Sequence, residues 1–152
     1  MNRRDTKIYI QGFSMLPLIT HNTQIIVDFS VKKYVLGDIL VLYDIKNRYF
    51  LAHRIIFLSN NSALIKGDNN PYADGYIPMK FFFGRVVALQ SNRQLVCLTT
   101  SFARIGQLRF VCISWFQLVN NHLKSVALIL KNILGRINRK MRGVSSRIRS
   151  VT

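Results

Sequence analysis

The chain has 152 residues, a mass of 17.6 kDa and a formal net charge of +16. This length suits one domain, or a small domain with an extension, and excludes a multidomain enzyme. The hydrophobic content of 49% excludes a wholly disordered chain.

Acidic residues stop early in the chain. Residues 1–90 carry 11 basic and 6 acidic side chains, a net charge of +5, and all of the acids are Asp. Residues 91–152 carry the other 11 basic side chains and no acid, a net charge of +11. We therefore predict two parts with separate tasks, residues 1–92 and residues 93–152, and an anionic partner for the second part.

Short apolar runs separated by turn residues fill the first part. Their length and their Val, Ile, Phe and Tyr content are typical of β-strands. No helical pattern of the kind that connects parallel strands lies between them. The sequence therefore predicts a mainly β fold with an antiparallel sheet, its strands at residues 7–11, 24–29, 38–43, 48–58, 63–66 and 81–89.

The spacing of apolar residues changes in the second part. From Val126 onward they recur every three or four residues, as on one stripe of an amphipathic helix, with Lys and Arg on the far side. The stripe consists of Val126, Leu130, Ile133, Ile137, Met141, Val144, Ile148 and Val151.

Only four residues, Ile8 to Gln11, separate the basic N-terminus from Gly12, so we expect no N-terminal membrane span.

Three partners suit a basic amphipathic helix. We expect residues 122–151 to bind an anionic membrane surface, which makes the protein a peripheral membrane protein. The helix could instead pack on its own β-domain and leave the basic face in water. Nucleic acid is not expected, because no recognition module accompanies the charge.

The two cysteines, Cys97 and Cys112, have no His or Cys at metal-ligand spacing beside them. We expect two buried free thiols, no metal site and no cofactor.

Candidate catalytic residues lie in the β-strand region. Ser14 follows a predicted strand in Gly12-Phe13-Ser14-Met15-Leu16-Pro17, where its hydroxyl can stay accessible. A hydroxyl needs a base to take its proton, and His53 interrupts an apolar strand as a candidate. Taken singly, Ser14 is more typical of a turn residue and His53 of a structural histidine. Asp68 and Asp74 could orient an imidazole, although turns also use Asp.

Five motifs in order change that assessment, and together they resemble the signal peptidase I family. The resemblance covers roughly residues 8 to 90 and matches the branch with a Ser/His pair. The motifs are Gly12 to Pro17, Gly37-Asp38-Ile39-Leu40-Val41, His53-Arg54, Lys66 to Asn70 with Asp74, and Gly84-Arg85-Val86.

The resemblance implies a coiled antiparallel sheet and a serine endopeptidase that removes leader or signal segments from peptide or protein precursors. It implies Ser14 as nucleophile, His53 as general base and Asp74 as the carboxylate that holds the imidazole. Asp68 would support the turn or share that task. The backbone N–H of Ser14 would stabilise the oxyanion.

The chain departs from the family pattern in three places. Gly12 stands where some members have a serine that helps to stabilise the oxyanion, Phe13 replaces a small residue, and the usual N-terminal anchor is not expected. These departures motivate an alternative, a non-catalytic cationic membrane-binding protein on a peptidase-like scaffold.

Overall fold

The computed structural model describes the backbone of residues 5–44, 49–91 and 94–149, and side chains from residue 6 to residue 136 within those ranges. The chain divides into two compact units, Met1–Gln117 and Leu118–Thr152. The charge pattern predicts a boundary at residue 92, earlier in the chain than this one.

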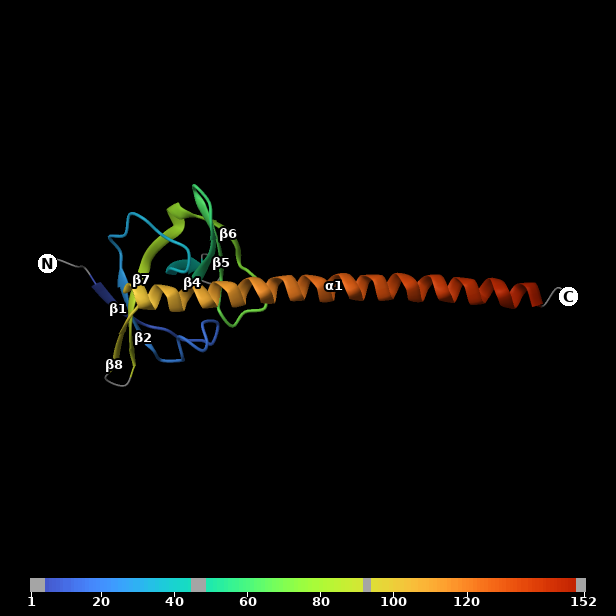
Figure 1. Ribbon diagram of the computed structural model, residues 1–152, viewed down its shortest axis with the longest axis horizontal. Helices are drawn as coiled ribbons and strands as arrows, with labels where there is room; N and C mark the ends of the chain where they lie inside the picture. Colours follow the sequence, from blue (N-terminus) through green and yellow to red (C-terminus); the bar gives the residue numbers. More distant parts are fainter. Residues whose placement is uncertain (1–4, 45–48, 92–93, 150–152) are drawn as a thin grey trace. The chain divides into compact units, whose positions relative to one another are not determined.

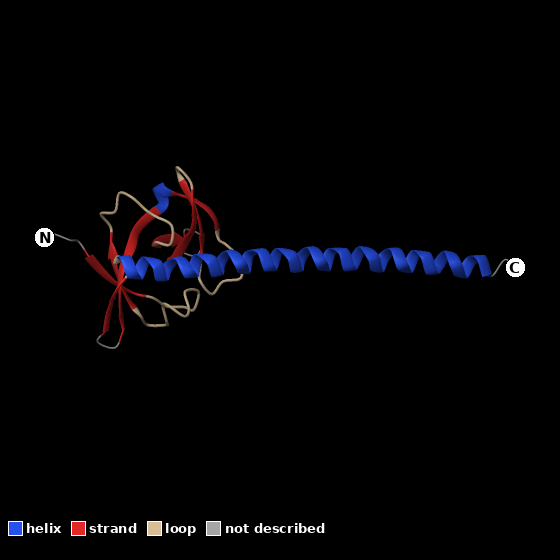
Figure 2. Cartoon of the chain, viewed as in Figure 1, coloured by secondary structure: helices blue, strands red, loops and turns tan. Residues whose placement is uncertain are grey.

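The first unit is built on an antiparallel sheet in the order β1-β2-β7-β3-β4-β5-β6, with β8 paired to β7 (Figures 1 and 2). This confirms the mainly β fold with a C-terminal helix. Six strands fall where the sequence predicted them, while the short strands β6 and β8 were missed. The elements are β1 Asp5–Tyr9, β2 Gln24–Asp28, β3 Ile39–Asp44, β4 Tyr49–Leu58, β5 Ser62–Lys66, β6 Gly75–Pro78, the 3₁₀ turn Met79–Phe81, β7 Phe82–Ser91, β8 Gln94–Cys97 and α1 Ser101–Arg149.

Strand β3 is buried on both faces and separates two apolar clusters. Because side chains alternate along a strand, Ile39 and Val41 face one cluster while Leu40 and Leu42 face the other. The first cluster also contains Met15, the residue that follows Ser14. Packing on both faces makes β3 a rigid base for its neighbour β4, which carries His53.

The first turns of α1 pack on this sheet (Figure 1). Gln107, Val111 and Ser114 are buried and recur at helical spacing. The indole Nε1 of Trp115 donates a 2.9 Å hydrogen bond to the carbonyl of Ile56, where the pairing of β4 with β5 shifts register. The start of the helix therefore completes the β-domain.

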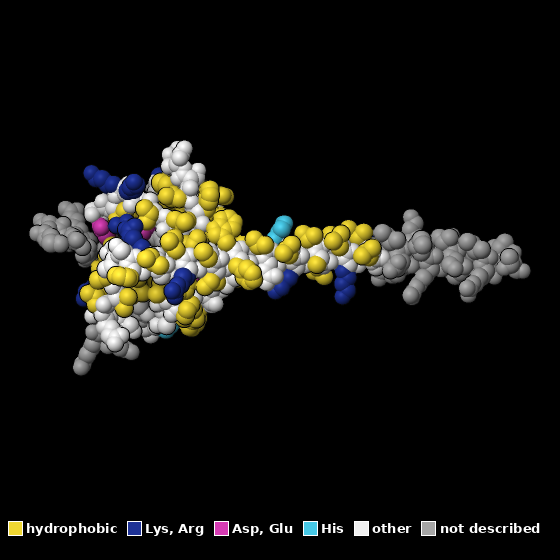
Figure 3. Space-filling model, in the orientation of Figure 1, with side chains coloured by type: hydrophobic (Ala, Val, Ile, Leu, Met, Phe, Trp, Pro, Cys, Tyr) yellow, Lys and Arg dark blue, Asp and Glu magenta, His cyan; other side chains and the backbone are white. Residues whose placement is uncertain are grey.

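The second unit consists of the later turns of α1. Its described apolar side chains are at least 40% exposed at Val119, Leu123, Val126, Leu130 and Ile133, which share one stripe. Lys124 and Lys131 are exposed, and Figure 3 shows Lys or Arg side chains projecting from this part of the helix. No described helix is long and apolar enough to cross a membrane. The remaining predicted stripe residues and Arg139, Arg142 and Arg149 lie outside the described side chains.

The expectation of buried thiols was wrong. Cys97 and Cys112 are both free and both exposed. Cys97 ends the edge strand β8, none of whose side chains is buried, and Cys112 lies on a helix face that the sheet does not cover.

Candidate active site

The Ser14 segment leaves β1 through a tight turn. Gly12 has φ +119°, a conformation that side chains with a Cβ rarely adopt. Phe13 is 62% exposed and Met15 is 2% exposed, so Met15 anchors the segment in the core. Ser14, between them, is partly exposed, and a Leu16–Pro17 cis peptide bond follows.

The turn after β5 holds the Ser14 backbone from the other side. The amide N–H of Asn69 donates to the Ser14 carbonyl at 2.7 Å, and Asn69 Nδ2 donates to the Phe13 carbonyl at 3.1 Å. This close contact between the two segments requires a glycine at position 67, because a Cβ there would lie 2.8 Å from the backbone carbonyl oxygen of Ser14. Two motifs far apart in sequence thus form one scaffold around the serine.

His53 and Asp74 form a hydrogen-bonded pair. His53 lies in the middle of β4, is 6% exposed, and its Nδ1 is 2.5 Å from Asp74 Oδ2. A carboxylate can only accept, so Nδ1 carries the proton and Nε2 is left to act as a base. The amide N–H of Asp74 donates to the carbonyl of Ile65 at 2.9 Å, which places the carboxylate at the end of β5.

Asp68 contacts a different residue. Its two oxygens accept hydrogen bonds from Nε and Nη2 of Arg54, both at 2.7 Å, and both side chains are almost fully buried. Arg54 also donates to the carbonyl of Gly37 and lies 4.9 Å from the ring centre of Phe110 on α1. The carboxylate on His53 is therefore that of Asp74, while Asp68 fixes the turn that carries Asn69.

A pocket of about 390 Å³ brings the candidate triad together. Ser14, His53 and Asp74 all line it, along with the extended stretches on either side of Ser14 and before His53. A nucleophile, an oriented base and a space for a peptide are the requirements for acyl transfer. The described residues contain no cluster of three or more His, Cys, Asp or Glu that could hold a metal ion.

Lys66 does not line this pocket. Its side chain is fully buried, and Nζ donates to the carbonyl of Gly67 at 3.1 Å and to Oε1 of Gln117 on α1 at 2.7 Å. Burial lowers the pKa of Lys66, and the nearby Asp68 and Asp74 carboxylates oppose that change. Its contacts tie the helix to the end of β5, a role that sequence analysis did not assign.

Two further residues that shape the site were not singled out from sequence. Asn69 holds the nucleophile segment, as described above, and its place in the Lys66 to Asn70 motif was the available signal. The second of these residues is His21. Its Nδ1 accepts a 3.4 Å hydrogen bond from the amide of Gly12, and its ring stacks on Phe13 with centres 5.7 Å apart. It supports the turn before Ser14.

No protein-family model, curated protein or solved structure matches the chain.

Proposed function

We propose that the protein is a serine endopeptidase of the signal peptidase type, which removes leader or signal segments from peptide or protein precursors. The observation that carries the proposal is the His53–Asp74 hydrogen bond beside Ser14 in one pocket. An imidazole held by a carboxylate next to an accessible serine is the arrangement that serine acyl transfer uses. The order of the five motifs supports the same reaction.

In the proposed reaction, Nε2 of His53 removes the Ser14 hydroxyl proton as Oγ attacks the scissile carbonyl. Asp74 holds the imidazole and stabilises the imidazolium that forms. His53 then protonates the leaving amine, and water attacks the acyl-enzyme with His53 again acting as the base. A hydrogen bond from Ser14 Oγ to His53 Nε2 is expected to form when a substrate fills the pocket. The backbone N–H of Ser14 is the proposed oxyanion donor.

The second unit supplies the proposed membrane attachment. Its exposed stripe of Val and Leu can enter the acyl boundary while Lys124 and Lys131 meet anionic head groups. Each basic residue near such a surface contributes about 1 kcal/mol. We propose that this unit holds the peptidase beside membrane-bound or exported precursors.

A degenerate peptide library analysed by mass spectrometry tests the reaction, together with a serine-directed acylating probe. We expect the wild type to cleave a subset of peptides and to be labelled only at Ser14. Ser14→Ala and His53→Ala should abolish cleavage while circular dichroism shows that both stay folded. Cleavage that persists in either variant would exclude the mechanism.

The alternative of a non-catalytic membrane-binding protein is motivated by Gly12 and Phe13. It predicts that the probe does not label Ser14 and that no peptide is cleaved, while anionic vesicles are still bound. Stoichiometric labelling confined to Ser14 would argue against it.

A further inference from the structure

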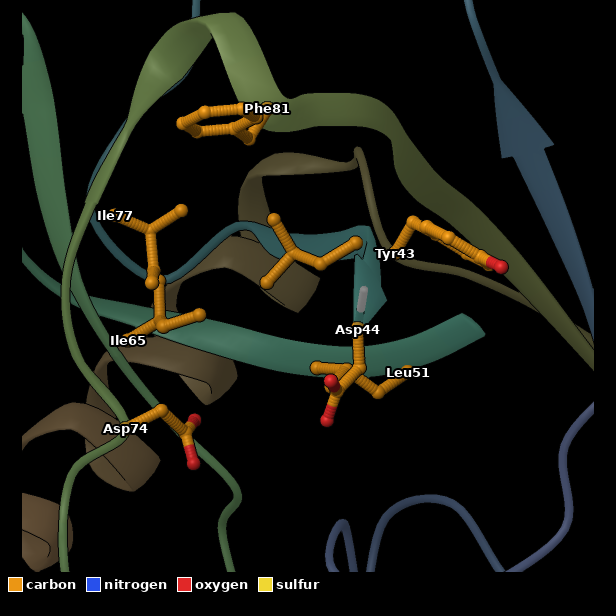
Figure 4. Close-up of a pocket in the computed structure, with 8 residues that line it drawn as sticks. Tyr43, Asp44, Leu51, Ile65, Asp74, Ile77 and Phe81 are labelled. Carbon is orange, nitrogen blue, oxygen red and sulfur yellow. The ribbon is translucent and has the colours of Figure 1, made fainter. Parts of the chain in front are cut away.

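A second pocket, of about 410 Å³, lies next to the Ser14 pocket. Apolar side chains from four neighbouring strands and the turn after β6 form its walls, with Phe81 and Ile77 at the end away from the two carboxylates (Figure 4). The proposed reaction does not use this space. Its lining residues are Leu42, Tyr43, Asp44, Leu51, Ile65, Asp74, Ile77 and Phe81.

The two pockets adjoin. Asp44, Leu51 and Asp74 line both of them, so their rims meet at the carboxylate that holds His53. Leu51 precedes His53 by two residues on β4, and residues two apart on a strand share a face. One extended residue spans about 3.3–3.6 Å, so a peptide bound at Ser14 reaches the second pocket within a few residues of the cleaved bond.

We propose that this pocket is a specificity subsite for one bulky apolar side chain, such as Phe, Leu or Met, of the substrate. The inference rests on the proposed peptidase function and adds a substrate class to it. Pockets of about 300–1,000 Å³ with apolar walls and a few polar groups at one end are typical of ligand sites. A bulky side chain removes more apolar area from water against these walls than Ala does, so it is bound more tightly.

Charge favours a peptide over a lipid as the occupant. Figure 4 shows the carboxylates of Asp44 and Asp74 near the same end of the pocket. No Lys or Arg occurs among the described residues that line either pocket, although the chain carries a net charge of +16. The Asp74 carboxylate, which lines both pockets, disfavours the anionic head of a fatty acid or phospholipid, whereas a peptide backbone brings no negative charge.

The library experiment tests the subsite through matched variants of β6. Ile77 lines the pocket, and Ile77→Trp should narrow it, whereas Tyr76 is 58% exposed and does not line it. We expect the wild type to cleave peptides with a bulky apolar residue at one position at least about 10-fold faster than peptides with Ala there. Ile77→Trp should remove that preference while Ser14 is still labelled by the acylating probe. The Tyr76→Trp control should keep the preference.

A binding experiment on the Ser14→Ala protein separates this inference from the proposed function. The probes are two fluorescein-labelled Ala/Gly decapeptides with a central Phe or a central Ala, measured by fluorescence anisotropy with oleate as the competitor. The Phe peptide should bind at least about 10-fold more tightly, and Ile77→Trp should remove the difference.

Each outcome decides one of the two proposals. If no peptide is cleaved and Ser14 is not labelled, the peptidase function fails, and the binding experiment still decides the subsite. Equal binding of the two peptides overturns the subsite, as does a preference that Ile77→Trp leaves unchanged. Displacement of the Phe peptide by oleate at lower concentration than by the unlabelled peptide would instead assign the pocket to a lipid.

Discussion

Arg54 and Asp68 form a fully buried ion pair in which Nε meets Oδ1 and Nη2 meets Oδ2, both at 2.7 Å. Arg54 directly follows His53, and successive side chains of a strand point to opposite faces. His53 therefore faces the pocket while Arg54 faces α1 and the turn before Asn69. One dipeptide links the proposed base to the scaffold that holds the proposed nucleophile.

Substitution of Asp68 is expected to lower stability, whereas substitution of Asp74 is expected to lower activity. Asp68→Asn leaves the Arg54 charge buried without a counterion, so we expect the free energy of unfolding to fall by about 3–5 kcal/mol. The Asp74 side chain is 31% exposed, so Asp74→Asn should stay folded and lower kcat by about 10⁴-fold, as in other triads. Urea denaturation and peptide cleavage measure the two effects. Full activity of folded Asp74→Asn would contradict the assignment of His53's partner.

Gly67→Ala should misplace the nucleophile. The new Cβ would lie 2.8 Å from the Ser14 carbonyl oxygen, so the backbone must move and the 2.7 Å bond from Asn69 must lengthen. Misplacement by about 1 Å can cost about 10²-fold in rate, so kcat for peptide cleavage should fall by that order. Gly106→Ala is the control, because its Cβ meets nothing within 4 Å and alanine favours a helix by about 1 kcal/mol. Equal kcat in both variants would show that the close approach is not needed.

Lys66 gives stability a defined dependence on pH. Burial lowers its pKa in the folded protein, so between that lowered pKa and the unfolded value of 10.5 the unfolded chain binds more protons. The contribution of Lys66 to the free energy of unfolding therefore rises as pH rises toward 10.5. Below the lowered pKa, Lys66 is charged in the folded protein, and the full cost of burying that charge lowers the free energy of unfolding. The difference in unfolding free energy between wild type and Lys66→Met should increase with pH in that window.

Urea denaturation of wild type and Lys66→Met from pH 7 to pH 10.5 measures this difference. The contributions of titratable groups that both proteins share cancel in it. Lys80→Met, at an exposed lysine, is the control and should give a difference that does not change with pH. A constant difference for Lys66→Met as well would mean that burial does not perturb its titration.

Truncation after Gln117 should separate catalysis from membrane attachment. A cut near residue 92 would also remove Gln107, Trp115 and Gln117, which form hydrogen bonds with Arg54, Ile56 and Lys66. The later cut removes 8 of the 22 basic residues and no acid. We expect the truncated protein to cleave peptides like the full chain and to lose co-sedimentation with anionic vesicles.

High salt should weaken vesicle binding of the full chain, because screening reduces attraction between exposed charges. Zwitterionic vesicles serve as the control. Unchanged binding to anionic vesicles after truncation would show that residues 118–152 are not the membrane-binding part.

The sequence by itself determined the local elements and the inventory of chemical groups. Strand positions and the amphipathic helix followed from periodicity, because each depends on residues close together in the chain. The candidate residues Ser14, His53 and Asp74 followed from the resemblance that the five ordered motifs carry. The sequence missed β6 and β8, which have four residues each and pair only because neighbouring strands hold them.

Only the tertiary structure decided which aspartate meets the imidazole. Asp68 and Asp74 lie six residues apart in one turn-rich segment, and both are compatible with the motif. The choice depends on Arg54, whose Nε and Nη2 donate to the two oxygens of Asp68, and on the carbonyl of Ile65, which fixes the backbone of Asp74. The same reason explains the exposed cysteines and the structural role of the helix start. Burial and pairing depend on which surfaces meet, and this is a property of the folded chain.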